Sequence, residues 1–298
     1  MNDDSFPPLL PETLRRLGRA LAPHGLVGII IMAASTALAA LGVEPAATWY
    51  RPLMGWGFLL FLDSVLLRLR GCSLLRGAPP ALVWMAPLSV ALWLVFEAYN
   101  LLLRNWAYAG APEDTALRFA WHAASFSTVL PALFLTAEFM KAVGWARPRT
   151  LRPVRVTESI LYGSMAAGAV MLVVPALFPS PYLFGLVLLG FVFLLEPVNY
   201  IFERPSLLRD LEEGKCERLF AWLWGGYACG FLWEIWNYGA AGQWRYSVPL
   251  TTESLGLPAL YVFEMPLTGF LGYGPFALEI FSMYHTACLL LGRRGREI

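Results

Sequence analysis

The stretch Gly190 to Arg209, GFVFLLEPVNYIFERPSLLR, indicates how the whole chain is built. It has an echo at Gly57 to Arg76, GFLLFLDSVLLRLRGCSLLR, and eight of the twenty aligned positions are identical. Each copy places an acidic residue inside an apolar run, because Asp63 falls opposite Glu196. The copies stand 133 residues apart, close to half of the 298-residue chain. We therefore predict a tandem duplication.

The composition is that of a membrane protein. Hydrophobic residues make up 58% of the chain and charged residues 14%, with a mean hydropathy of +0.57. Soluble domains carry about 25% charged residues, so this balance excludes an ordinary soluble domain. Twelve Trp and twelve Tyr suit membrane interfaces. The four cysteines show no CxxC spacing, and we expect Cys72 and Cys216 to be free thiols.

Apolar runs of roughly 17–25 residues are long enough to cross a bilayer. Pro266, Gly269, Gly274 and Pro275 interrupt the last apolar region, which predicts a broken or interfacial first portion before the final span. We count eight predicted spans, at 25–43, 52–70, 81–103, 117–140, 159–178, 181–202, 218–238 and about 272–291.

The placement of basic residues supports this count. With the N-terminus inside, only Arg51, Arg104, Arg118 and Arg245 of the 22 basic residues fall in outer segments. Such an excess of inner Lys and Arg is the positive-inside signal. We expect a multi-pass protein of the plasma (inner) membrane with both termini cytoplasmic.

The predicted fold class is an all-α integral membrane protein of eight helices, arranged as two tandem parallel four-helix repeats with the last helix broken. Within the leader, residues 11–21 have the spacing of a short amphipathic helix on the membrane surface. The predicted divisions are a cytoplasmic amphipathic leader (1–24), repeat 1 (25–140), a basic cytoplasmic linker (141–158), repeat 2 (159–292) and a cytoplasmic tail (293–298).

Carboxylates inside apolar spans are the candidate functional groups. A charged carboxylate at mid-membrane costs about 2.5–3.5 kcal/mol even on insertion scales. Such groups are protonated, hydrogen-bonded, bound to a cation or exposed to a hydrated cavity. This chain has seven in or beside its spans: Asp63, Glu97, Glu138, Glu196, Glu234, Glu264 and Glu279.

Asparagines follow three of these acids at a spacing of three residues, which places amide and carboxylate on one face of a helix. The pairs are Glu97 with Asn100, Glu196 with Asn199, and Glu234 with Asn237. The amide is then able to donate to the carboxylate or to offer its carbonyl to a ligand. Trp106-x-Tyr108 and Trp244-x-Tyr246 follow the first and third pairs, and an aromatic belt is the simpler interpretation of these four residues.

The predicted topology separates an outer from a more central acidic layer. In the outer layer we predict Glu97, Glu234 and Glu264 as catalytic residues. The predicted substrate-binding residues are Asn100, Asn237, His122, Trp106, Tyr108, Trp244 and Tyr246. The second acidic layer consists of Asp63, Glu196, Asn199 and Glu279.

The segments Glu97 to Tyr108 and Glu234 to Tyr246, followed by Phe263-Glu264-Met265-Pro266, carry a family resemblance. The chain resembles the small membrane lycopene cyclases of carotenoid biosynthesis, which are also built from duplicated multi-helix units. That family's Pro-x-Glu-Glu-x-x-Phe-Phe run is missing here. The resemblance implies acid catalysis on a polyene, with Glu234 and Glu264 as the acid candidates.

Three functions fit these observations. The first is an intramembrane enzyme acting on a lipid or isoprenoid through acid–base chemistry, or through a divalent cation bound by carboxylates. The second is a proton- or cation-coupled transporter, and the third is an assembly subunit whose acids hold helices together. We expect a membrane lipid or isoprenoid as partner and no nucleic acid, and leave a membrane protein partner or a homo-oligomer open. No certain cofactor and no metal ligand set follows from the sequence.

Overall fold

The computed structural model describes residues 20–146, 151–293 and 295, most of them in helices. The amphipathic helix predicted at 11–21 falls outside these residues except for its last two positions. The first half of the described chain contains α2 (Pro23–Ala40), α3 (Tyr50–Arg70), α4 (Leu74–Gly77), α5 (Pro79–Leu103), α6 (Thr115–Phe126) and α7 (Val129–Ala142).

The second half of the described chain contains four long helices with short helical segments between them. It contains α8 (Glu158–Leu177), the 3-10 turn η1 (Pro181–Leu183), α9 (Phe184–Ile201), α10 (Leu207–Glu212), α11 (Glu217–Asn237), the 3-10 turn η2 (Glu253–Leu255), α12 (Leu267–Phe270) and α13 (Tyr273–Leu290). The interruption expected around residues 266–275 lies between the short helix α12 and α13.

Six helical segments of the described chain are long and apolar enough to span a membrane. They are α2, α3, α5, the α6–α7 segment, α8, and η1 with α9. Helices α11 and α13 have 21 and 18 residues but fall outside this group. Both carry polar residues that other helices bury, among them Glu234, Asn237, Glu279 and His285. A helix enclosed by other helices has less need of an apolar surface facing lipid.

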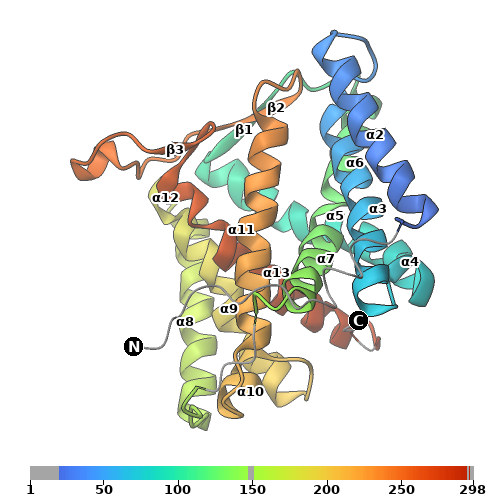
Figure 1. Cartoon of the computed structure of the whole chain (residues 1–298). Helices are drawn as coiled ribbons and strands as arrows, with labels where there is room; N and C mark the ends of the chain where they lie inside the picture. Colours follow the sequence, from blue (N-terminus) through green and yellow to red (C-terminus); the bar gives the residue numbers. More distant parts are fainter. Residues whose placement is uncertain (1–19, 147–150, 294, 296–298) are drawn as a thin grey trace, which may run out of the picture.

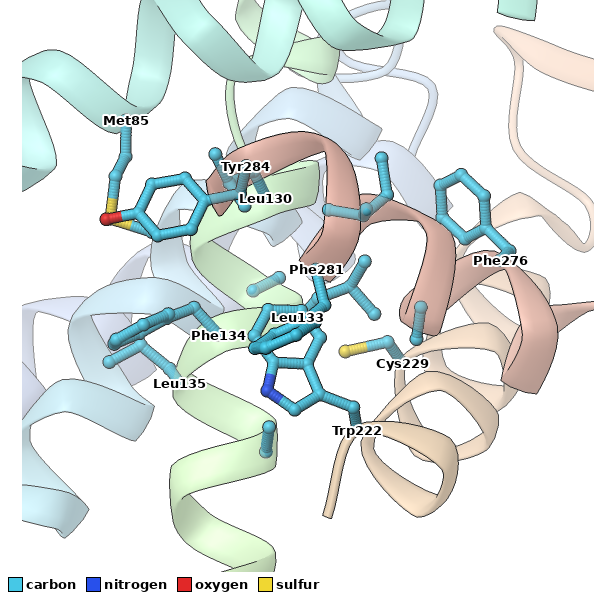
Figure 2. Packing of buried hydrophobic residues seen from close by; sticks show 14 of the residues in the cluster. Met85, Leu130, Leu133, Phe134, Leu135, Trp222, Cys229, Phe276, Phe281 and Tyr284 are labelled. Carbon is cyan, nitrogen blue, oxygen red and sulfur yellow. The ribbon is translucent and has the colours of Figure 1, made fainter. Parts of the chain in front are cut away.

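Helices α7, α11 and α13 form the centre of the molecule. In Figure 2, Phe134 of α7, Trp222 of α11 and Phe281 of α13 lie together, and Trp222 meets the other two rings edge-on at centroid distances of 6.3 and 5.2 Å. Helix α2 packs along α3, and α8 packs along α9, on the outside of this centre. Helices α2, α8 and α9 leave most of their residues unburied, as lipid-facing helices do, whereas most of α3 is buried.

Glycines allow these two outer pairs to approach closely. A Cβ on Gly28 of α2 would lie 2.4 Å from the carbonyl oxygen of Gly57 in α3. A Cβ on Gly168 of α8 would lie 2.7 Å from the carbonyl oxygen of Gly190 in α9. Gly57 and Gly190 are the first residues of the two related stretches, and small residues at such crossings are typical of membrane helices.

Two short antiparallel ribbons add to the helical fold that the sequence predicts. Strand β1 (Trp106–Ala109) pairs with β2 (Gln243–Tyr246), so that Trp106 lies opposite Tyr246 and Tyr108 opposite Trp244. Strands β3 (Tyr261–Val262) and β4 (Met265–Pro266) form a separate hairpin. Figure 1 shows the β1–β2 ribbon at the upper end of the molecule and α10 at the lower end.

Candidate functional site

The β1–β2 ribbon is fixed to the helices by two asparagine side chains. Asn100 Nδ2 donates to the carbonyl of Trp106 at 2.9 Å, and the Trp106 N–H donates to Asn100 Oδ1 at 3.0 Å. Asn237 makes the same pair of bonds with Trp244, at 2.9 and 2.8 Å. The expected contact between each amide and the carboxylate one turn earlier is replaced by these bonds. Both asparagines position the ribbon, and neither lines the cavity described below.

The two outer carboxylates accept hydrogen bonds from aromatic side chains. Glu97 Oε1 accepts from Trp93 Nε1 at 2.8 Å, Trp106 Nε1 at 3.2 Å and the Tyr108 hydroxyl at 2.5 Å. Glu234 Oε1 accepts from the hydroxyls of Tyr246 and Tyr273, each at 2.5 Å.

The two carboxylates differ in burial and in the use of their second oxygen. Glu234 is 0% exposed, and its Oε2 has no hydrogen-bond partner among the described residues. Glu97 is only half-buried. A buried carboxyl oxygen without a donor is unfavourable, so Glu234 is the better placed of the two to hold a proton.

A cavity of about 410 Å³ lies beneath the ribbon, between the first and second halves of the chain. Its volume falls within the usual range of small-molecule sites, about 300–1,000 Å³. About half of the residues that line the cavity carry aromatic rings. They include Trp93, Phe96, Trp121, Phe126, Phe184, Trp233, Trp236 and Phe276.

Five of the predicted substrate-binding residues line this cavity: Trp106, Tyr108, His122, Trp244 and Tyr246. The three predicted catalytic residues, Glu97, Glu234 and Glu264, do not. The tyrosines stand between the cavity and the first two carboxylates, because their rings line the cavity and their hydroxyls bind Glu97 and Glu234. Any chemistry of these acids on a cavity ligand therefore passes through a phenol.

His122 packs against aromatic rings of its own helix and of β1. The ring centroids of Tyr108, Trp121 and Phe126 lie 4.6, 4.9 and 5.2 Å from that of His122. His122 Nδ1 is buried and has no hydrogen-bond partner among the described residues. One polar atom of this imidazole is therefore left without a protein partner beside the cavity.

Glu264 occupies the turn between β3 and β4 and is half-buried. With the Gln243 amide in its better-satisfied orientation, Gln243 donates to Glu264 Oε2 at 3.3 Å and accepts from Arg245 Nη2 at 3.2 Å. Glu264 therefore belongs to a polar group beside the ribbon, and the structure does not bring it to the cavity wall.

Three further residues line the site although no sequence motif singles them out: Arg51, Trp121 and Tyr273. Arg51 was counted as an outer-loop charge just before the span at 52–70, but α3 begins one residue before it and Arg51 is 7% exposed. Its guanidinium carbon lies 4.4 Å from the ring centroid of Trp121 and 4.6 Å from that of Trp244. The only sequence signal was an arginine following Trp49-Tyr50 at the start of an apolar run.

The second acidic layer holds the short helices at the opposite end. Glu196 Oε2 accepts from the Ser206 hydroxyl at 2.9 Å and from the N–H groups of Leu207 and Leu208 at 2.6 and 3.4 Å. Asp63 Oδ1 accepts from the Leu75 N–H at 3.2 Å. Both related stretches end in Ser-Leu-Leu-Arg, and this ending forms the first turn of α4 in one stretch and of α10 in the other. The acid of the same stretch binds free N–H groups of that turn.

Asn199, Glu279 and Glu138 are also engaged within the helix bundle. Asn199 donates to the carbonyl of Ser282 at 3.0 Å and accepts from Thr286 Oγ1 at 2.9 Å. Glu279 accepts from the Phe191 N–H at 3.2 Å, and its Oε2 has no hydrogen-bond partner among the described residues. Glu138 forms ion pairs with Arg70 and with Lys141, the latter at 2.9 Å.

The ribbon tyrosines remain protonated over a wide pH range. Burial, reinforced by the nearby Glu97 carboxylate, raises the pKa of Tyr108 well above its usual value of 10.0. Burial, together with Tyr273 and Glu234, likewise raises the pKa of Tyr246. Both phenols therefore keep a proton to donate at neutral pH.

Neither a metal-binding cluster nor a similar protein helps to assign a function to this site. Within the described ranges, no group of three or more His, Cys, Asp or Glu residues is placed to hold a metal ion. All four cysteines are free thiols. Comparison of the chain with protein-family models, with curated proteins and with solved structures found no match.

Proposed function

We propose that this protein is an intramembrane enzyme that moves protons to and from a lipid or isoprenoid substrate bound in the aromatic cavity. One observation carries the proposal: Tyr108, Tyr246 and Tyr273 line the cavity and donate hydrogen bonds to carboxylates outside it. Each phenol therefore connects a cavity ligand to an acid that does not itself line the cavity.

The proposed acid is Glu234. In its protonated form it donates to Tyr246 or Tyr273, and that tyrosine gives its own proton to a double bond of the substrate. The two hydroxyls are 3.0 Å apart, so a proton is able to pass between them. The substrate cation then loses a proton to the tyrosine–Glu234 pair, which is thereby protonated again. The product is an isomer of the substrate or a cyclised form of it. The reaction is redox-neutral and needs no other reactant.

The aromatic wall suits such a reaction. Ring faces attract a cation, and their apolar surface excludes water that would trap the cation as an alcohol. The resemblance to membrane lycopene cyclases implies the same class of chemistry. In this proposal Glu97 and Tyr108 serve as the second acid–phenol pair beside the cavity.

The test begins with an organic extract of the purified protein, analysed by mass spectrometry for an enriched unsaturated lipid or isoprenoid. That compound is then incubated with fresh protein in deuterated water. We expect one deuterium to enter the product at carbon. Replacing Glu234→Gln lowers the initial rate by about 10²–10⁴-fold, the usual contribution of a general acid.

The matched control is Glu113→Gln, which changes an exposed loop carboxylate in the same way. Thermal unfolding in detergent verifies that both variants are folded. A folded Glu234→Gln protein with the full rate would refute the role of this acid. An extract with only bulk phospholipid, together with proton-driven solute uptake in proteoliposomes, would assign the protein to the carriers instead.

We also propose the finer architecture: eight spans in two parallel four-helix repeats, in the inner membrane, with both termini cytoplasmic. Matching packing supports the repeats, since α2–α3, α3–α7 and α5–α7 contacts have counterparts in α8–α9, α9–α13 and α11–α13. The equivalent asparagine bonds to Trp106 and Trp244 support the same interpretation.

A further inference from the structure

Arg51 is a buried cation with no charged partner in the described part of the chain. It is 7% exposed, and its Nε and Nη2 have no hydrogen-bond partner there. None of the ion pairs among the described residues includes it. An arginine in a folded protein remains protonated, so a full positive charge stands at the cavity wall.

The rings around Arg51 do not replace an anion. Trp121 and Trp244 lie close to the guanidinium, at 4.4 and 4.6 Å, and attract the charge through their ring quadrupoles. They accept no hydrogen bond in the plane of the guanidinium, where its N–H groups point. The nearby carboxylates are already bound by tyrosine hydroxyls, which face them from β1 and β2.

Further polar atoms of the wall share this lack of partners. His122 Nδ1 and Trp244 Nε1 are buried without a hydrogen-bond partner in the described residues. The indole N–H is only a donor, and the imidazole nitrogen is a donor in one tautomer. The wall of an apolar cavity thus contains a cation whose Nε and Nη2 find no acceptor among the described residues, together with an imidazole nitrogen in the same condition.

We propose that the cavity binds an amphipathic ligand whose anionic head group, a carboxylate or a phosphate, is held by Arg51. The planar guanidinium matches both head groups, because each presents two oxygens to parallel N–H donors. The aromatic wall holds the apolar chain of the same ligand. This inference rests on the proposed function for the site and narrows its substrate class to acidic lipids or isoprenoids.

The test compares anionic and neutral probes by quenching of tryptophan fluorescence in detergent. The probes are oleate and oleyl alcohol, farnesyl phosphate and farnesol, and inorganic phosphate alone. We expect the wild-type protein to bind each anionic probe at least tenfold more tightly than the matched alcohol. Arg51→Gln removes this difference and leaves the affinity for the alcohols unchanged, whereas Arg51→Lys retains part of it.

Arg245→Gln is the control, because Arg245 lies on the same ribbon with its side chain exposed. A preference for oleate alone or farnesyl phosphate alone identifies the head group, and binding of inorganic phosphate alone shows that no chain is needed. Equal affinities for anionic and neutral probes, or an anion preference that survives in Arg51→Gln, would overturn the proposal. If Arg51→Gln does not fold, the test uses Arg51→Lys: a partial loss of the anion preference supports the proposal, and an undiminished preference overturns it.

Failure of this inference is distinguishable from failure of the enzymatic proposal. Anion-selective binding without any conversion leaves the Arg51 site standing and removes the acid catalysis. Deuterium incorporation into a neutral substrate, without any preference for anionic probes, supports the acid catalysis and removes the Arg51 site.

Discussion

At the scale of single residues, neighbouring donors decide what each buried carboxylate does. Glu196 accepts from two hydroxyls and two backbone N–H groups and so holds α10 against α9 and α13. Glu234 accepts from two phenols that line a cavity. The same residue type therefore has a structural role at one end of the molecule and a candidate chemical role at the other.

Glu196→Ala is expected to destabilise the protein without affecting its chemistry. The change leaves the Ser206 hydroxyl and the Leu207 N–H without their acceptor in a buried place, whereas the Ser282 hydroxyl keeps the Leu278 carbonyl. We expect a loss of about 2–4 kcal/mol in the free energy of unfolding, measured by thermal or denaturant unfolding in detergent. The rate per folded molecule stays at the wild-type value. If Glu196→Ala kept the wild-type stability but lost the reaction rate, Glu196 would take part in the reaction.

At the scale of elements, the β1–β2 ribbon joins segments that are far apart in the sequence and covers the cavity. It brings Tyr108 and Tyr246 to the same wall through the pairing of Trp106 with Tyr246 and Tyr108 with Trp244. Gly110 is required at its edge. It has a φ of +65°, and a Cβ there would lie 1.9 Å from the carbonyl oxygen of Ala241. The ribbon thus depends on backbone fit as well as on the two asparagines.

Tyr108→Phe should change how stability depends on pH. The folded-state pKa of Tyr108 is raised above 10.0, so the unfolded chain releases this proton first and stability falls as pH rises above about 10. We expect the variant to be less stable at pH 7, because the bond to Glu97 is lost. Above pH 10 the free energy of unfolding of the variant falls less steeply than that of the wild type, by up to about 1.4 kcal/mol per pH unit.

Unfolding free energies from pH 7 to 11 provide the measurement. Tyr162→Phe is the control, because it removes a hydroxyl from a tyrosine that is 61% exposed on α8. Parallel pH profiles for the wild type and Tyr108→Phe would show that Tyr108 is not a buried, protonated group.

At the scale of the whole molecule, the cavity exists because the two halves of the chain meet. Its wall takes Arg51 and Trp93 from the first half and Trp233, Trp244 and Tyr273 from the second. Neither half alone would enclose this space. The ribbon and the loop before β3 lie at one end of the molecule and α10 at the other, so the proposed topology places them on opposite sides of the membrane (Figure 1).

Single cysteines test that topology. In a background without Cys72, Cys216, Cys229 and Cys288, we expect Leu257→Cys to react with a membrane-impermeant maleimide added to intact cells. Glu213→Cys is expected to react only after the membrane is opened. Both positions are exposed in the structure, so access depends on the membrane alone. Labelling of both, or of neither, in intact cells would refute the proposed orientation.

The sequence by itself determined the positions of the long helices and which acids lie within apolar segments. Helix boundaries follow from apolar run length, as for α5, predicted at 81–103 and found at Pro79–Leu103. The break before α13 follows from proline and glycine placement, because these residues interrupt helical hydrogen bonding. The alignment places Asp63 opposite Glu196 but Leu66 opposite Asn199, which predicts that the two halves are not equivalent in function. In the structure both acids bind the first turn of a short helix.

Only the tertiary structure decided which of these residues meet. Trp106 and Tyr246 are cross-strand neighbours because a ribbon pairs the two segments, and the Trp-x-Tyr motif that these segments share does not indicate that they lie side by side. Asn100 and Asn237 bind strand backbone and not the adjacent carboxylates, since the strands bring unpaired peptide groups to them. Arg51 enters the site because α3 begins before it and the second half of the chain closes over it. The burial of a side chain and the partners that it contacts depend on this long-range packing. The periodicity of a single helix does not specify such packing.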